Sequence, residues 1–283
     1  MAGPRFSVSE FTTMPLSFDE DVAAYAAGGA EGIGLAEAKL PAGQDAASLA
    51  TLRAAGLTAV ICLPECLSVL PLPPFPGPEE PEERVASICA SVRRFARFEP
   101  VAMLCLTGPV GDRDPDEARA IAAEGLREIA AAGAQAGVRV ALEPIHASAR
   151  DDFTMVDTIP GAVEFLESAG ADMGIMFDTW HLWDTPNVLD EIRRHAGRFV
   201  GVHVNDWRDP TRGWDDRALP GEGVMDLPAI FEALEEGGYD GWFELEIFSS
   251  ETYPDSLLKL DPVELVRRGR VGFLDAWEER KGA

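Results

Sequence analysis

Four ionisable residues, Glu143, Asp178, His203 and Glu246, each stand at or near the end of a short apolar run. In the run Phe199–Asn205, every second residue from position 200 is valine, and the histidine falls between two of these valines. Alternate residues of a strand face opposite sides, so the imidazole would point away from the valines and into the space that a barrel encloses. The same alternation separates the three carboxylates from the apolar side chains of their own runs. We expect all four side chains to converge at one end of neighbouring strands.

Three carboxylates and one imidazole in a protein interior predict a bound cation. Each charge is costly to bury alone, and the carboxylates repel one another unless a cation lies among them. The donor set suits Mn²⁺, Mg²⁺, Co²⁺ or Zn²⁺. Taken singly, such a glutamate is usually an ion-pair partner and such a histidine a hydrogen-bonded core residue, but the four together favour a divalent metal. Alternation does not separate Glu246 from Glu244, and we favour Glu246 because it is nearer the carboxyl end of its run.

Two further histidines and three tryptophans fall near the same end of the predicted strands. His181 follows Asp178 by three residues, and in a loop above the metal it would hydrogen-bond a substrate oxygen or relay a proton. The alternative is a histidine that only anchors the loop, and His146 divides evenly between the two roles. Trp180, Trp207 and Trp214 would either stack on a substrate or pack the rim.

The apolar runs alternate with amphipathic or alanine-rich segments along the chain. The predicted strands are Phe6–Ser9, Gly32–Glu37, Thr58–Leu63, Val101–Thr107, Arg139–Ile145, Gly174–Asp178, Phe199–Asn205 and Trp242–Phe248. The predicted helices are Asp19–Ala27, Ala46–Ala55, Glu82–Phe98, Asp116–Gln135, Gly161–Ser168, Val188–His195, Leu227–Glu236 and Pro262–Glu279. Such alternation indicates βαβ units and a parallel sheet. Eight units without a linker predict an α/β fold, a single closed (β/α)8 barrel over residues 1–283, whose active site would lie at the carboxyl ends of the strands.

Composition narrows the classes of partner. The formal net charge is −25, which disfavours nucleic acid and anionic membrane surfaces, because both bind concentrated Lys and Arg. No apolar run approaches the roughly 20 residues that span a bilayer, and the N-terminus shows no signal-peptide pattern. The four cysteines lie in apolar segments without metal-site spacing, which predicts buried free thiols in a reducing cytoplasm. No Lys/Arg cluster indicates a phosphate site, so an unphosphorylated substrate is favoured.

The segments that carry the ionisable residues resemble the metal-bearing strand ends of the xylose isomerase-like TIM-barrel superfamily of sugar isomerases and epimerases. The similar segments are ALEPIH around Glu143, FDTWH around Asp178, GVHVND around His203 and ELEIF around Glu246. The loop DDRALPGEGVMDL, which includes Arg217, is similar to the segment that follows the histidine strand in that superfamily. SEFTT at Ser9–Thr13 resembles the first strand of its inosose (2-keto-myo-inositol) isomerase branch.

The resemblance implies one divalent metal on these four residues, with Mn²⁺ as the first choice and Co²⁺, Mg²⁺ or Zn²⁺ as alternatives. Glu143 and Glu246 would then double as acid and base, exchanging a proton on the carbon next to a carbonyl through a metal-stabilised enediolate. The implied substrate is a small sugar or inosose ketone that is isomerised or epimerised. Arg217 would reach this substrate, together with His181, His146 and Trp180. A homo-oligomer would fit the resemblance, since relatives are often dimers or tetramers.

One departure and three rival functions accompany the resemblance. Relatives often carry charged residues on the inward face of the second strand, where this chain has Gly34 and Ala36, so we expect a roomier or less polar pocket there. DNA repair by the endonuclease branch is disfavoured, because no histidine precedes His146 and the chain is strongly acidic. A metal-dependent lyase, similar to dehydroshikimate dehydratases or to enzymes that cleave C-glycosides, is the main alternative. A barrel that binds sugar without catalysis is the third.

Overall fold

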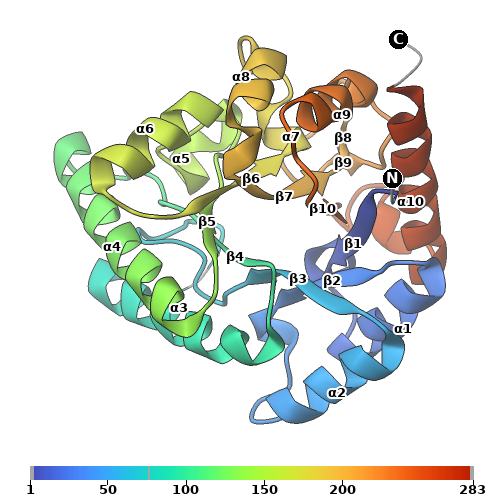
Figure 1. The fold of residues 1–283 in the computed structure, drawn as a ribbon, viewed down its shortest axis with the longest axis horizontal. Coiled ribbons are helices and arrows are strands. Elements are labelled where there is room, and N and C mark those ends of the chain that lie inside the picture. Colours follow the sequence, from blue (N-terminus) through green and yellow to red (C-terminus); the bar gives the residue numbers. More distant parts are fainter. Residues whose placement is uncertain (1–2, 76, 281–283) are drawn as a thin grey trace.

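The computed structural model describes residues 3–75 and 77–280. Eight parallel strands close into a barrel in the order β1-β10-β7-β6-β5-β4-β3-β2 (Figure 1). The strands are β1 (Arg5–Ser9), β2 (Gly32–Ala36), β3 (Thr58–Leu63), β4 (Ala102–Cys105), β5 (Val140–Leu142), β6 (Gly174–Asp178), β7 (Phe199–Val204) and β10 (Trp242–Leu245). The predicted (β/α)8 fold is therefore confirmed.

A ring of helices covers the outside of the barrel (Figure 1). These helices are α1 (Phe18–Gly28), α2 (Asp45–Ala55), α3 (Pro81–Phe95), α4 (Pro115–Ala136), α6 (Ile159–Ala169), α8 (Val188–His195), α9 (Leu227–Glu236) and α10 (Pro262–Glu279). The helix ends are set by capping hydrogen bonds and by local backbone conformation. For example, Asp114 caps α4 by accepting from the amides of Asp116 and Glu117, Pro115 takes the first position, and Gly137 ends the helix at a φ of 71°.

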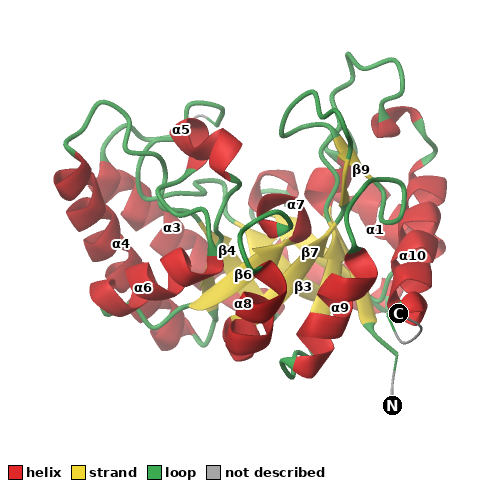
Figure 2. Cartoon of the chain, turned by 90° about the horizontal axis from the view of Figure 1, so that it is seen from above, coloured by secondary structure: helices red, strands yellow, loops and turns green. Residues whose placement is uncertain are grey.

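Additional short elements decorate the carboxyl ends of the strands, where Figure 2 shows α5 and β9 rising above the barrel. They are the 3₁₀ turn η1 (Glu10–Thr13), α5 (Arg150–Phe153), α7 (Thr179–Leu182) and the antiparallel pair β8 (Asp206–Trp207) and β9 (Arg217–Ala218). In the part of the chain that is described, no helix is both long and apolar enough to cross a bilayer. The four cysteines are free and buried, as predicted.

The predicted strands that include Glu143 and Glu246 are too long at their carboxyl ends. β5 ends at Leu142 and β10 at Leu245, so Glu143 and Glu246 are the first residues after their strands. Their amides still donate to the neighbouring strands, from Glu143 to Cys105 O at 3.2 Å and from Glu246 to Val204 O at 3.2 Å. The side chains therefore keep the inward direction that alternation predicts.

The alternation predicted for β7 is wrong at Val200. Phe199 pairs with Ile175 of β6 but Gly201 pairs with Met176, so one extra residue is inserted in β7. Val200 consequently packs with the cluster inside the barrel that contains Met176, whereas Val202 packs between the barrel and the helices. The irregularity precedes His203, which retains its inward position opposite Asp178.

Candidate active site

The four predicted ligands converge at the carboxyl ends of four adjacent strands. Nδ1 of His203 lies 3.2 Å from Oε1 of Glu143, 3.3 Å from Oε2 of Glu246 and 3.8 Å from Oδ2 of Asp178. The side chains come from β5, β6, β7 and β10, which follow one another around the barrel. Register fixes the contact between the central pair, because Asp178 and His203 are directly paired residues. We call these four residues the ligand cluster.

The ligand cluster fits a divalent cation. One donor atom each from Asp178, His203 and Glu246 lie within 4.8 Å of one another, and so do donors of Glu143, Asp178 and His181. Two atoms that are each bonded to one ion at roughly 2.2 Å can lie at most about 4.4 Å apart, so only small adjustments would be needed. Carboxylate oxygens with one imidazole nitrogen are also a donor set that divalent metals favour.

Arg217 supplies a positive charge to the same carboxylates. Its Nη1 lies 2.8 Å from Oδ2 of Asp178 and 3.1 Å from Oε2 of Glu246, and the residue is only 2% exposed. The arginine belongs to β9, and its backbone amide donates to Phe248 O at 3.1 Å, which joins the hairpin to the segment after β10. The expectation that Arg217 reaches the reaction centre is consistent with this position.

Burial and neighbouring charges shift the pKa values of the cluster residues in different directions. Desolvation raises the pKa of Glu143 to about 7, and it also raises the pKa of Glu246. Burial would raise the pKa of Asp178 as well, but the nearby cations, Arg217 first, hold that pKa at about 2. Burial disfavours the charged imidazole of His203, yet Glu246 and Glu143 raise its pKa well above the usual value.

His181 lines the pocket as a neutral imidazole. It lies in α7 rather than in a loop, because Asp178 caps that helix by accepting from the amide of Trp180 at 2.7 Å. Burial lowers the pKa of His181 to about 3. Its Nδ1 accepts the amide hydrogen of His146 at 3.3 Å, and its Nε2 lies 3.3 Å from Nη2 of Arg217 and 3.7 Å from Oδ2 of Asp178.

Two predicted substrate contacts lie outside the pocket lining. Trp180 is 1% exposed and packs on Trp207 with ring centroids 4.6 Å apart. The side chain of His146 is turned toward Ser148 and Asp184, at 2.7 and 3.3 Å. In this structure Trp180 packs against a neighbouring ring and the His146 side chain is turned away from the pocket, so contact of either residue with a substrate stays a prediction.

Alternation alone does not separate Glu244 from Glu246, and the structure places Glu244 in the barrel interior, on the opposite side of the His203 ring from the ligand cluster. Its Oε1 lies 3.4 Å from Nε2 of His203, and Ser7 Oγ donates to Oε2 at 2.8 Å. A Cβ atom at Gly34 would come within 2.2 Å of this carboxylate. The expected roomier pocket at Gly34 is therefore wrong: Glu244 fills the space. Alternation had shown that Glu244 points inward, but not how deep it lies.

Two polar residues after β7 were also missed. Asn205 Nδ2 donates to Oδ1 of Asp178 at 3.0 Å and so orients a predicted ligand. The Asp206 carboxylate accepts four amide hydrogens at 2.8 to 3.0 Å, from Trp207, Gly221, Gly223 and Met225. The glycine-rich loop GEG was a usable signal for such close backbone packing.

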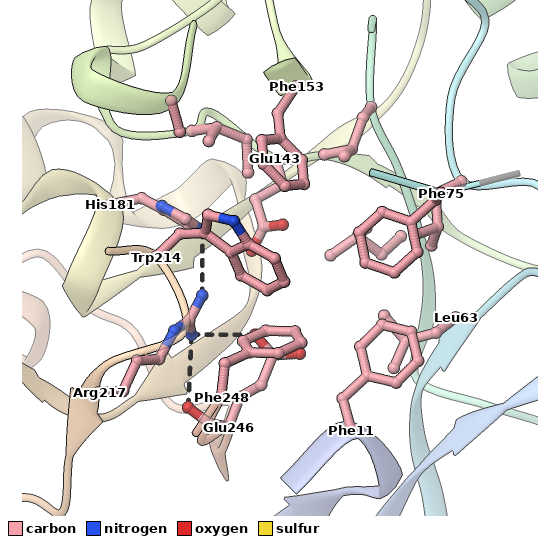
Figure 3. Close-up of a pocket in the computed structure, with 15 residues that line it drawn as sticks. Phe11, Leu63, Phe75, Glu143, Phe153, His181, Trp214, Arg217, Glu246 and Phe248 are labelled. Atoms are coloured by element: carbon pink, nitrogen blue, oxygen red, sulfur yellow. Dashed lines mark hydrogen bonds and ion pairs between the residues drawn. The ribbon is translucent and has the colours of Figure 1, made fainter. Parts of the chain in front are cut away.

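A pocket with a cavity volume of about 50 Å³ opens above the ligand cluster. Glu143, His181, Arg217 and Glu246 line one side (Figure 3). The remaining lining residues are all apolar: Phe11, Leu63, Leu67, Phe75, Leu104, Leu106, Ile145, Ala149, Phe153, Trp214 and Phe248. Three tryptophans are expected near the rim, and of these Trp214 alone is among the described residues that line this pocket.

Comparisons with known proteins agree with the fold. A family model described as xylose isomerase-like TIM barrel matches residues 22–270. Inosose isomerase of Bacillus velezensis is 28% identical over 144 residues, which are 49% of this chain and 50% of that protein. L-ribulose 3-epimerase of Mesorhizobium japonicum is 31% identical over 136 residues, or 47% and 42% of the two chains. The chain thus spans about half the length of the curated relatives it matches. A crystal structure of the IolI protein with a bound zinc atom has the same fold, with a TM-score of 0.77 over 98% of this chain and 99% of that chain, at 19% identity.

Proposed function

Because this chain belongs to the xylose isomerase-like TIM-barrel family, we propose that it is a divalent-metal-dependent isomerase or epimerase of a small sugar-like or inosose ketone. Residues 1–283 would act as one catalytic domain. The relatives named inosose isomerase and L-ribulose 3-epimerase support this class of substrate and reaction. We infer Mn²⁺ as the first choice of metal, and the bound zinc of the IolI protein supports a divalent ion in this fold.

One observation carries the proposal: the ligand cluster divides into two kinds of residue. Asp178 and His203 are fully buried, with 0% exposure, and do not line the pocket. Glu143 and Glu246 both line it, with 5% and 3% exposure. Two carboxylates that touch the pocket can exchange protons with a substrate, while the two buried residues can only hold an ion.

The residues of the chain would divide the work as follows. Glu143, Asp178, His203 and Glu246 would hold the metal, which when bound supplies Lewis-acid polarisation of the substrate carbonyl. Glu246 and Glu143 would remove a proton from the carbon next to the carbonyl and return one to it. His181 lines the pocket, where its imidazole would hydrogen-bond a substrate oxygen or relay a proton. Arg217 places a fixed positive charge where negative charge develops.

Hydrogen exchange with solvent tests the proposal directly. Metal-depleted protein would be incubated in D2O with a panel of ketoses and inososes, and then again after addition of Mn²⁺. We expect solvent deuterium at the carbon next to the carbonyl in an isomeric product, and only after metal is restored. Isomerisation that is equally fast without metal, or a product without solvent deuterium, would contradict the proposal.

A metal-dependent lyase is the second candidate. The apolar side of the pocket lies directly beside Glu143 and Glu246, so an apolar leaving group would have a place to reside while a carboxylate removes the proton (Figure 3). The same deuterium experiment separates the two functions. Loss of water or of an aglycone from the substrate would favour the lyase, whereas a rearranged product of unchanged mass apart from deuterium favours the isomerase.

A further inference from the structure

The pocket is strongly divided for a site that would bind a sugar. Eleven of its fifteen lining residues are apolar. The four ionisable ones lie together on one side of the pocket: Glu143, His181, Arg217 and Glu246. A polyol has a hydroxyl on nearly every carbon, and each hydroxyl that leaves water without a new partner costs free energy. The apolar side chains offer no such partners. The pocket therefore suits a ligand that is polar at one end only.

Five aromatic rings form a continuous wall on the apolar side, and we call them the aromatic collar: Phe11, Phe75, Phe153, Trp214 and Phe248. Ring centroids lie 6.1 Å apart for Phe75 and Phe153, 5.6 Å for Phe153 and Trp214, 5.4 Å for Trp214 and Phe248, and 5.7 Å for Phe248 and Phe11. All four pairs are tilted or edge-on. Aromatic groups favour such contacts with another ring, so the collar is chemically suited to a flat apolar guest.

The loops that carry two of the collar rings are held by polar anchors. Arg84 is 2% exposed, and it donates to Ser68 O at 2.8 Å and to Pro78 O at 2.9 Å, which spans the loop that carries Phe75. Arg212 bonds Asp216 at 2.7 Å and thereby closes the loop that carries Trp214. Rings supported in this way are pre-formed rather than collapsed loop tips.

Four of the five collar residues are incompletely buried. Phe11, Phe75, Trp214 and Phe248 retain partial exposure, although they surround one pocket. Apolar surface that stays in contact with water at a pre-formed cavity is stabilised when an apolar ligand displaces that water. The arrangement thus points to a ligand as the missing contact.

We propose that the substrate is an α-hydroxyketone that carries an aromatic or similarly flat apolar group, rather than a free sugar. The inference rests on the proposed function for the orientation of the ketone. The hydroxyketone end lies against Glu143, Glu246 and His181, and the flat group lies within the aromatic collar. During the reaction a C–H bond breaks as a glutamate accepts the proton, and a new C–H bond forms at the same or the neighbouring carbon, so no oxidant or reductant is needed.

Two small probes share the reacting end and differ in the rest. 2-Hydroxyacetophenone and dihydroxyacetone both contain a hydroxymethyl ketone, but the first adds a phenyl ring and the second a second hydroxymethyl group. With Mn²⁺-loaded protein in D2O, we expect the kcat/KM for deuterium exchange to be at least tenfold higher for 2-hydroxyacetophenone. Trp214→Ala and Phe153→Ala should reduce this ratio toward one. Trp277→Ala, a loss of a ring on α10 at the outside of the barrel, should leave the ratio unchanged.

The outcomes separate the two proposals. Exchange of dihydroxyacetone at an equal or higher kcat/KM would overturn the aromatic substrate class and leave the proposed function intact. Exchange of neither probe would count against the proposed function, and calorimetric binding of both probes to the Mn²⁺-loaded protein would then decide the substrate class. Tighter binding of 2-hydroxyacetophenone that is lost in Trp214→Ala supports the inference, and equal binding overturns it. Melting temperatures of all variants would show that the changes do not reflect unfolding.

Discussion

The two sides of the barrel mouth differ in chemical character: one carries ionisable side chains and the other is apolar (Figure 3). The polar half, from β5, β6, β7 and β10, carries the ligand cluster, in which nearly every charge has a partner of opposite sign. The apolar half is built by η1, the ends of β3 and β4 with the loops after them, α5, the connection between β8 and β9, and the segment after β10. It carries the aromatic collar and no ionisable side chain in the pocket lining. The difference teaches that chemistry and recognition are assigned to separate residues. A change in one half should therefore leave the property of the other half in place.

The largest effect is expected in the polar half, from Glu246→Gln. The amide keeps the size of the side chain but cannot accept a proton, so the kcat for exchange or isomerisation should fall by ~10²- to 10⁴-fold. Binding of an apolar ligand to the collar should persist. Glu251→Gln, the same change at an exposed position in the following loop, is the control. Turnover near that of the unchanged protein would remove Glu246 from the mechanism.

The next largest effect concerns metal retention. His203→Ala removes the imidazole around which the carboxylates gather, and we expect at least roughly 100-fold weaker binding of Mn²⁺, beyond what loss of an outer partner costs. Elemental analysis after dialysis measures this directly. His181→Ala is the matched comparison, because it should lower turnover more than metal content. Unchanged metal in His203→Ala would contradict the ligand assignment.

A smaller effect is expected from Glu244→Gln. The carboxylate fixes His203 from the opposite side of the ring without touching the pocket, so its loss should weaken Mn²⁺ binding by about 10- to 100-fold. The ratio of kcat/KM for the two hydroxyketone probes should not change, because the collar is untouched. A shift in that ratio would show that the two halves are coupled through the barrel interior.

The smallest effect is expected in the apolar half, from Arg84→Met. Removal of the guanidinium leaves the carbonyls of Ser68 and Pro78 without their donors, and the free energy of unfolding should fall by about 1–3 kcal/mol. Urea denaturation measures the change, and Arg53→Met, at an exposed position, serves as the control. Metal content should stay the same. A loss of metal in Arg84→Met would break the separation of the halves.

The sequence predicts the polar half far better than the apolar half. Alternation of residues places His203 correctly, because one buried face constrains every second residue of a strand. It does not detect the inserted residue at Val200 or the depth of Glu244, since both depend on register with neighbouring strands. It also assigns Trp180 to the rim, because a tryptophan beside a ligand looks the same in the sequence whether it packs or binds.

Of the aromatic collar, the sequence indicates only Trp214, as a tryptophan near the rim. The five rings come from five separate segments, and each of the four phenylalanines by itself looks like an ordinary core residue. Only the closed barrel brings Phe11 next to Phe248, across the junction of β1 and β10. A charged residue in an apolar run stands out in a sequence because its burial is costly without a partner. An apolar wall can be recognised only once the fold has brought its residues together.

The four amide hydrogens gathered by Asp206 have a consequence for how new specificity can arise. They tie both ends of the hairpin to one carboxylate, so the intervening residues 208–216 form an exchangeable insert. Substitutions or length changes in this segment would replace Trp214, while Arg217 would keep its position beside the ligand cluster. A lineage that keeps Asp206 can therefore diversify what it recognises without rebuilding how it reacts.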